Sequence, residues 1–289
     1  MKPLQLAELL LLAALWGGSF LFMRIAAPEL GPIWLIELRV LLSGLALLPL
    51  LLRQGLWRQV QGHWRSLWVV GLLNSALPFS LLAFTSLSLP AGTTAILNGT
   101  VPFLGVAVAY VWLREPLTLS RVLGLGVGFS GVVVLVGWQA TALTAEIWLA
   151  IATGLCAALL YAIAAPYIRL YLHGVPSLVI ATGSQLSAAV CLLPLLPFTQ
   201  PATAPSSTAL LAVVGLALLS TSLAYILYFR LIHAVGSTRA LTVAYLIPLF
   251  AILWGAIALQ EAITPSMVIG GGLILLGTAI ANQVFPRSP

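Results

Sequence analysis

The sequence predicts an all-α integral membrane protein of ten transmembrane helices, arranged as two inverted five-helix repeats around a central cavity. Three observations support this prediction. First, the 289-residue chain is 61% hydrophobic and only 6% charged, with a mean hydropathy of +1.13, whereas soluble domains carry about 25% charged residues. Second, the chain divides into apolar runs long enough to cross a bilayer. Third, a pattern in the first half returns in the second.

Each apolar run has the length that a membrane helix needs, which is about 20 residues. Polar positions and clusters of proline and glycine separate the runs. The predicted spans are 5–25, 33–52, 66–86, 91–113, 121–138, 146–168, 177–198, 207–228, 236–258 and 265–285. The connections between them are short, so no soluble domain is expected. The runs are continuously apolar rather than alternating, which favours helices over the strands of a barrel.

The repeated pattern lies in Val101–Gly137 and returns 146 residues later. The matching positions are Pro102 with Pro248, Glu115 with Glu261, and Gly124, Gly126 and Gly131 with Gly270, Gly272 and Gly277. Self-similarity at a fixed offset indicates a duplicated architecture. We therefore predict two domains, residues 1–140 and 141–289.

The positions of lysine and arginine predict the orientation, because these residues gather in cytoplasmic loops. With a cytoplasmic N-terminus, the inside holds Lys2, Arg53, Arg58, Arg65, Arg114, Arg121, Arg169, Arg230, Arg239 and Arg287, and the outside holds only Arg24. Both termini are therefore expected on the cytoplasmic side of a bacterial inner membrane. Five spans in each half force the second half to enter with the opposite sense, and inverted repeats are typical of secondary transporters with a site near the midplane.

Several of these motifs resemble a known family. The run 113–118 (Leu-Arg-Glu-Pro-Leu-Thr), its partner 259–264 (Leu-Gln-Glu-Ala-Ile-Thr), the first-span sequence 15–20 and the Pro32 to Arg39 stretch resemble EamA-type carriers of the drug/metabolite transporter superfamily. Among these, the chain is most similar to YddG-type exporters of aromatic amino acids. The resemblance implies a cavity enclosed by spans one to four and six to nine, with spans five and ten to one side. One departure is Gln185, which stands roughly where Arg39 stands in the other half.

Polar and aromatic residues inside the spans are the candidate substrate-binding residues. An amide or hydroxyl group facing lipid would be costly, so these side chains should face inward, and pocket walls are typically aromatic. The candidates are Trp16, Ser19, Phe20, Asn74, Phe79, Thr94, Asn98, Tyr161, Gln185, Tyr225 and Tyr245. The alternative roles are hydrogen bonds between helices for the polar residues and anchoring at the membrane surface for the aromatic ones.

Prolines and charged residues within the spans are the remaining candidates. Pro78, Pro102 and Pro248 are interpreted as hinges, because proline removes a backbone donor and bends a helix; static kinks are the alternative. Glu37 and Arg39 lie in the second span, with Arg24 near the outer end of the first. We interpret these three residues as a structural ion pair near the outer surface, in which Glu37 meets Arg24.

The missing residue types narrow the function. No basic residue is expected at mid-membrane depth, which disfavours phosphorylated cargo, and the chain has no aspartate, which disfavours a proton-coupled pump. We therefore expect a small-molecule substrate that is neutral or zwitterionic. Amino acids, including aromatic and hydrophobic ones, are the leading class, exported by alternating access without an obligatory coupling ion.

Other functions remain open as alternatives. One is a multidrug or other metabolite carrier of the same fold, and another is a membrane interaction protein that transports nothing. No catalytic residue, metal site or cofactor is expected, because all three histidines fall in loops. The scattered basic residues form no nucleic-acid surface. The expected partners are the substrate and the lipid bilayer, with the chain as a monomer or, alternatively, a dimer.

Overall fold

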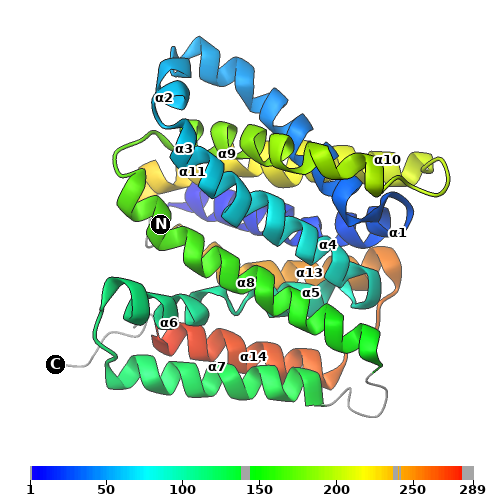
Figure 1. The fold of residues 1–289 in the computed structure, drawn as a ribbon. Coiled ribbons are helices and arrows are strands. Elements are labelled where there is room, and N and C mark those ends of the chain that lie inside the picture. The colour runs from blue at the N-terminus through cyan, green and yellow to red at the C-terminus, as the bar shows by residue number, and fades with distance from the viewer. Residues whose placement is uncertain (1, 138–143, 237–239, 241, 282–289) are drawn as a thin grey trace.

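The computed structural model describes residues 2–137, 144–236, 240 and 242–281. Within these residues all regular secondary structure is helical (Figure 1). The helices are α1 (Pro3–Arg53), α2 (Trp57–Gly62), α3 (Trp64–Gly71), η1 (Leu72–Ala76), α4 (Leu77–Ser88), α5 (Ala91–Asn98), α6 (Val101–Leu113), α7 (Leu119–Gly137), α8 (Ala145–Tyr171), α9 (Ser177–Leu192), η3 (Leu193–Phe198), α10 (Ser207–Val214), η4 (Gly215–Leu223), α11 (Ala224–Val235), α13 (Val243–Leu259) and α14 (Pro265–Ala281). Arg239 and Arg287, which were used to predict the orientation, lie outside the described residues.

Seven helical stretches in the described chain are long and apolar enough to cross a membrane, and two shorter apolar helices follow. The seven are Pro3–Arg53, Trp64–Ser88, Ala91–Leu113, Leu119–Val136, Ala145–Tyr171, Ser177–Phe198 and Ser207–Val235, and the shorter two are α13 and α14. Burial is incomplete in every one, and many large apolar side chains face outward, as lipid contact requires. The protein is therefore a multi-pass helical membrane protein.

Helix α1 is bent rather than continuous. Its 51 residues would extend about 76 Å at 1.5 Å per residue, more than twice the ~30 Å hydrocarbon thickness. The backbone leaves helical geometry at Gly31, with φ 71° and ψ 156°, a conformation open almost only to glycine. Gly31 therefore divides α1 into two segments that correspond to the first two predicted spans.

Two interhelical arrangements dominate the packing. Helix α1 packs against α4, α9, η4 and α13, whereas α7 and α14 pack mainly on each other (Figure 1). Gly124 lies against Gly277, and Gly131 lies against Gly270, so α7 and α14 run antiparallel. Glycine at these positions allows the two backbones to touch, as small residues do between membrane helices.

Two helices widen into π-helical turns in their middle. The segment η1 lies between α3 and α4 and joins them into one span, and η4 joins α10 and α11 in the same way. In η4 the Thr221 hydroxyl donates to the Leu216 carbonyl at 2.8 Å, and the Ser222 hydroxyl donates to the Ala217 carbonyl at 3.0 Å. Such turns are rare and are frequent at functional sites.

The predicted hinge prolines lie in three different settings. Pro78 begins α4 directly after η1, and Pro248 lies inside the helix α13. Pro102 is not within a continuous helix, as the sequence pattern implied, because α5 ends at Asn98 and α6 begins at Val101. Pro102 therefore lies in the first turn of α6, where its missing N–H breaks no hydrogen bond of the helix interior.

The bend of α1 is tied to the start of α10, and this contact predicts a dependence on pH. The Glu29 carboxylate accepts from the Ser206 backbone N–H at 2.6 Å and from the Ser206 hydroxyl at 2.8 Å. The backbone bond first, and then the hydroxyl bond, lower the pKa of Glu29 below its ordinary value of 4.5. The stabilisation is therefore present at neutral pH and is lost as the pH falls through this lowered pKa. We expect the unfolding midpoint of Glu29→Gln to fall less than that of the natural chain between pH 7 and pH 3, a range that extends well below the ordinary pKa of 4.5; equal falls would contradict this.

Candidate functional site

A buried arginine marks the candidate site. Arg39 of α1 is 4% exposed, and its Nε donates to the Thr221 hydroxyl of η4 at 3.1 Å. Thr221 is the middle residue of the 29-residue span Ser207–Val235. The Arg39 guanidinium therefore lies near the middle of the helical bundle, which corrects the expectation that no basic group lies at this depth.

Two further polar contacts accompany this one. The Gln185 amide of α9 donates to the Ser75 hydroxyl of η1 at 3.1 Å, and the Ser222 hydroxyl of η4 donates to the Ser43 hydroxyl of α1 at 3.1 Å. All these residues are buried. We call the set Arg39, Ser43, Ser75, Gln185, Thr221 and Ser222 the central polar layer. Each of its three contacts joins a residue before position 140 to one after position 141.

Aromatic rings surround the Arg39 guanidinium. Its central carbon lies 3.5 Å from the centroid of the Phe79 ring, a cation–π distance. The Tyr161 ring packs edge-on against Phe79 with 6.2 Å between centroids. Tyr225 lies near the guanidinium and stacks on Phe229. Of the predicted binding residues, Gln185 thus belongs to the central polar layer, and Phe79, Tyr161 and Tyr225 lie beside it.

The other predicted binding residues are placed elsewhere or make contacts of their own. Trp16 packs against Tyr228 with ring centroids 5.1 Å apart, and Phe20 lies in the apolar core. Thr94 donates to the Pro90 carbonyl of its own helix turn, whereas the buried Asn98 Oδ1 has no partner. Ser19 is buried, and Asn74 and Tyr245 are partly buried.

The predicted pairing of Arg24 with Glu37 is wrong. Arg24 instead meets Glu261, with 3.4 Å between Nε and Oε1, and donates to the carbonyls of Ser86 and Leu87. The Glu37 Oε2 is buried without a hydrogen-bond partner. Sequence patterns predict only a turn role for Glu261, because Arg24 is far from it along the chain.

A second cluster of charges lies at the equivalent turn of the first half. Glu115 pairs with Arg121 at 2.9 Å and with Arg169 of α8 at 3.4 Å. The residues before the two glutamates, Arg114 and Gln260, both have φ 54° and ψ 30°. The two acidic turns therefore have the same local backbone, and each reaches an arginine of the other half of the chain.

The Glu261 contact predicts a measurable loss of stability. The Glu261 carboxylate accepts from the Ala91 N–H at 2.9 Å, and its side chain is 13% exposed. We expect Glu261→Gln to destabilise the protein by about 1–3 kcal/mol, because a charged hydrogen bond and the Arg24 partner are lost. Thermal unfolding of the detergent-solubilised protein measures this. Glu146→Gln, at an exposed glutamate of α8, is the control, and equal midpoints for both variants would contradict the prediction.

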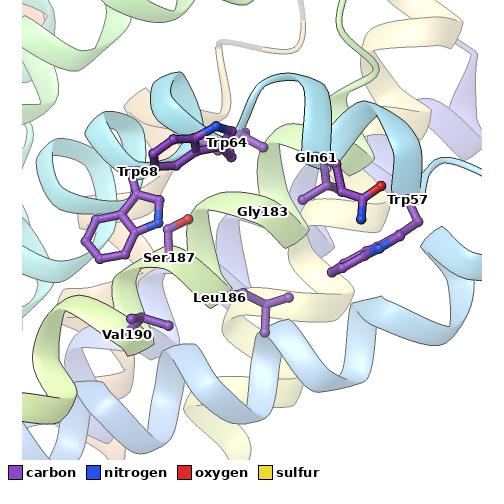
Figure 2. Close-up of a pocket in the computed structure, with 10 residues that line it drawn as sticks. Trp57, Gln61, Trp64, Trp68, Gly183, Leu186, Ser187 and Val190 are labelled. Atoms are coloured by element: carbon purple, nitrogen blue, oxygen red, sulfur yellow. The ribbon is translucent and has the colours of Figure 1, made fainter.

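Two grooves on the outside of the bundle lie apart from the three contacts of the central polar layer. The first has a volume of about 250 Å³ and lies between α2, α3 and α9 (Figure 2). Trp57, Trp64 and Trp68 line it and are themselves exposed, as membrane-surface anchors are. The second, of about 320 Å³, is lined by the first segment of α1, by η4 and by Trp254. Both grooves are almost entirely apolar.

Sequence reasoning missed Ser75 and the role of Thr221 as the Arg39 partner. Thr221 was one of several hydroxyl residues in its span, with nothing local to distinguish it. The usable signal was the 146-residue offset, because it pairs Arg39 with Gln185 and also Ser75 with Thr221. Each half therefore supplies one long polar side chain and one hydroxyl acceptor.

Multiple apolar helices around a buried polar layer fit a membrane transporter, and the comparisons with known proteins point to a transporter rather than an enzyme. The chain belongs to the EamA-like transporter family, whose profile matches residues 6–137 and 148–283. The resemblance to EamA-type carriers that the sequence motifs indicate is thus confirmed.

Several curated relatives are named transporters or exporters. The chain is 22% identical to the uncharacterized transporter YoaV of Bacillus subtilis, over 94% of both chains. It is 26% identical to a probable terminal-alkyne amino-acid exporter of Streptantibioticus cattleyicolor, over 70% of this chain and 68% of that one. It is 25% identical to an S-adenosylmethionine/S-adenosylhomocysteine transporter of Chlamydia muridarum, over 96% and 91%. A solved crystal structure with 20% identity superposes with a TM-score of 0.69 over the whole of both chains, which shows a shared fold.

Proposed function

We propose that this protein is a secondary transporter of small neutral or zwitterionic metabolites, with α-amino acids as the leading class. Aromatic and hydrophobic amino acids are included, and the transporter works by alternating access across a bacterial inner membrane. The observation that carries the proposal is the central polar layer. Every contact in it joins the two halves of the chain, so a substrate held there could be released to either side as the halves rock.

The proposal includes ten membrane helices in two inverted repeats, 1–140 and 141–289, around a central cavity. The Gly31 bend makes α1 two helices, which supports the count of ten with the other stretches. The offset of 146 residues equates Gly124 with Gly270 and Gly131 with Gly277. In the structure Gly124 lies against Gly277, and Gly131 lies against Gly270, on helices that run antiparallel. This exchange of equivalent positions supports an inverted relation between the halves.

Two considerations support amino acids as the substrate class. One relative is named for an amino acid, and S-adenosylmethionine and S-adenosylhomocysteine, which name another, are themselves α-amino acids. Phe79 and Tyr161, beside the central polar layer, offer apolar surface for a side chain. The distribution of Lys and Arg supports cytoplasmic termini.

Counterflow in proteoliposomes tests this function. Purified protein is reconstituted, loaded with one unlabelled amino acid, and supplied outside with the labelled form, with and without a pH gradient. We expect saturable counterflow for at least one aromatic or aliphatic amino acid, unchanged by the gradient. Counterflow of none of them would reject the amino-acid class, and uptake only of other metabolites or drugs would support the wider carrier alternative.

A further inference from the structure

Arg39 carries a charge that no carboxylate neutralises in the part of the chain that the structure describes. The four ion pairs there involve other arginines. Glu37 is two residues away on the same helix, about 200° around its axis, so the two side chains point to different faces. An arginine inside a membrane helix bundle is costly even on insertion scales, and such residues are rare. A buried arginine with no ion-pair partner among the described residues therefore points to a function for the charge.

The Arg39 guanidinium has N–H donors without partners among the described residues. Arginine has five N–H donors in a planar fork. The Nε atom donates to the Thr221 hydroxyl, and the buried Nη1 has no hydrogen-bond partner in the part of the chain that the structure describes. Phe79 covers one face of the plane at 3.5 Å. The unpaired edge of the fork is the part suited to a carboxylate, which binds arginine through two parallel hydrogen bonds.

A second unpartnered group belongs to Gln185. The Gln185 Nε2 donates to Ser75, while its Oε1 is buried and has no hydrogen-bond partner among the described residues. Ser75 and Phe79, which Gln185 and Arg39 contact, are four residues apart on the same helical stretch, or about one turn. The stretch Trp64–Ser88 therefore brings an unused acceptor and an unused donor edge to neighbouring turns.

We propose that Arg39 binds the carboxylate of the transported solute and that the Gln185 Oε1 accepts from its ammonium group. This assignment rests on the proposed transport function and narrows it to solutes with an α-amino-acid head. A single guanidinium matches one carboxylate, whereas a phosphate would call for more cationic groups. Phe79 and Tyr161 then face the solute's side chain. The halves must part to admit the solute, because Arg39 and Gln185 are buried in this state.

Competition in the counterflow assay measures separately how much the carboxylate and the ammonium group of the solute contribute to binding. Labelled L-phenylalanine and L-leucine are the probes. The competitors are phenethylamine, which lacks the carboxylate, L-phenylalaninamide, in which the carboxylate is neutralised, and 3-phenylpropionate, which lacks the ammonium group. We expect 3-phenylpropionate to compete measurably and the amine and amide to compete about tenfold or more weakly than L-phenylalanine.

Variants assign these effects to residues. Arg39→Gln should raise the half-saturation concentration for L-phenylalanine by about tenfold or more. Arg39→Lys, which keeps the positive charge, should raise it by less. Gln185→Ala should weaken the binding of L-phenylalanine, but it should leave the competition by 3-phenylpropionate, which has no ammonium group, unchanged. Arg65→Gln, at an exposed arginine beside Trp64, is the matched control and should behave as the natural chain does.

The outcomes separate this inference from the proposed function. If no amino acid shows counterflow, the amino-acid function itself is rejected. If amino acids are transported but the amine and amide compete as well as the acid, only the Arg39 assignment is overturned. The competition profile of the natural chain decides this even if Arg39→Gln fails to fold.

Discussion

Replacing Gly131 with leucine is expected to remove most of the folded protein, whereas the same replacement at Gly126 in the same helix is expected to be tolerated. A Cβ atom at Gly131 would lie 2.7 Å from both the Gly270 carbonyl oxygen and the Ile274 nitrogen of α14. These are backbone atoms, so no side chain can move aside. Helices α7 and α14 would have to separate, at a cost of about 3 kcal/mol or more.

The control comes from the same helix. Gly126 is exposed, and a Cβ atom there would meet nothing within 4 Å, so its leucine would extend toward lipid. The second helix offers the same comparison, since a Cβ atom at Gly270 meets backbone atoms at 2.9 Å and one at Gly272 meets nothing within 4 Å. Size-exclusion profiles and unfolding midpoints of detergent-extracted protein measure the effect. Matching profiles for the Gly131 and Gly126 variants would disprove close α7–α14 packing.

A disulfide between positions 43 and 222 is expected to stop transport almost completely and reversibly. The hydroxyl oxygens of Ser43 and Ser222 are 3.1 Å apart, and they belong to α1 and η4, in opposite halves of the chain. Cysteines with this approach are candidates for the Cβ separation that a disulfide needs. If transport requires the halves to rock, a covalent link across the central polar layer fixes one state.

The experiment uses a chain in which Cys156 and Cys191 are first replaced by alanine, because these are the natural free cysteines. Ser43→Cys/Ser222→Cys is oxidised in proteoliposomes, and counterflow is measured before oxidation, after it, and after reduction. Each single cysteine variant, treated alike, shows the effect of the oxidant alone. A linked transporter that keeps its full rate would mean that these two helices move together, which contradicts rocking at this seam.

Much of the fold could be predicted from local patterns. Apolar runs must become helices in a bilayer, because lipid offers no partner for backbone groups. The helical bounds in the first half, such as 91–113, therefore follow the predicted runs closely. The Gly31 bend was predicted only as a gap between two runs. The break before Pro102 was not predicted, because proline at a helix start and proline inside a helix look alike in sequence.

The candidate site was predicted only in part. Aromatic and amide residues such as Phe79, Tyr161 and Gln185 were found by their type and depth. Their grouping around Arg39 depends on which faces of α1, α4, α8 and α9 pack together. Local sequence patterns do not show which faces of distant helices meet. For the same reason Arg24 was given the wrong partner, Glu37 in place of Glu261.

The sequence by itself determined that this is a helical membrane protein of the EamA-like family with a repeated pattern. Those properties depend on composition, run length and short motifs, which lie along the chain. Only the tertiary structure decided that Arg39 is buried against Thr221 and Phe79, with no carboxylate partner among the described residues, and that the buried Gln185 Oε1 has no hydrogen-bond partner there. Burial and unsatisfied hydrogen bonds are properties of packed helices, and they arise only when distant segments meet.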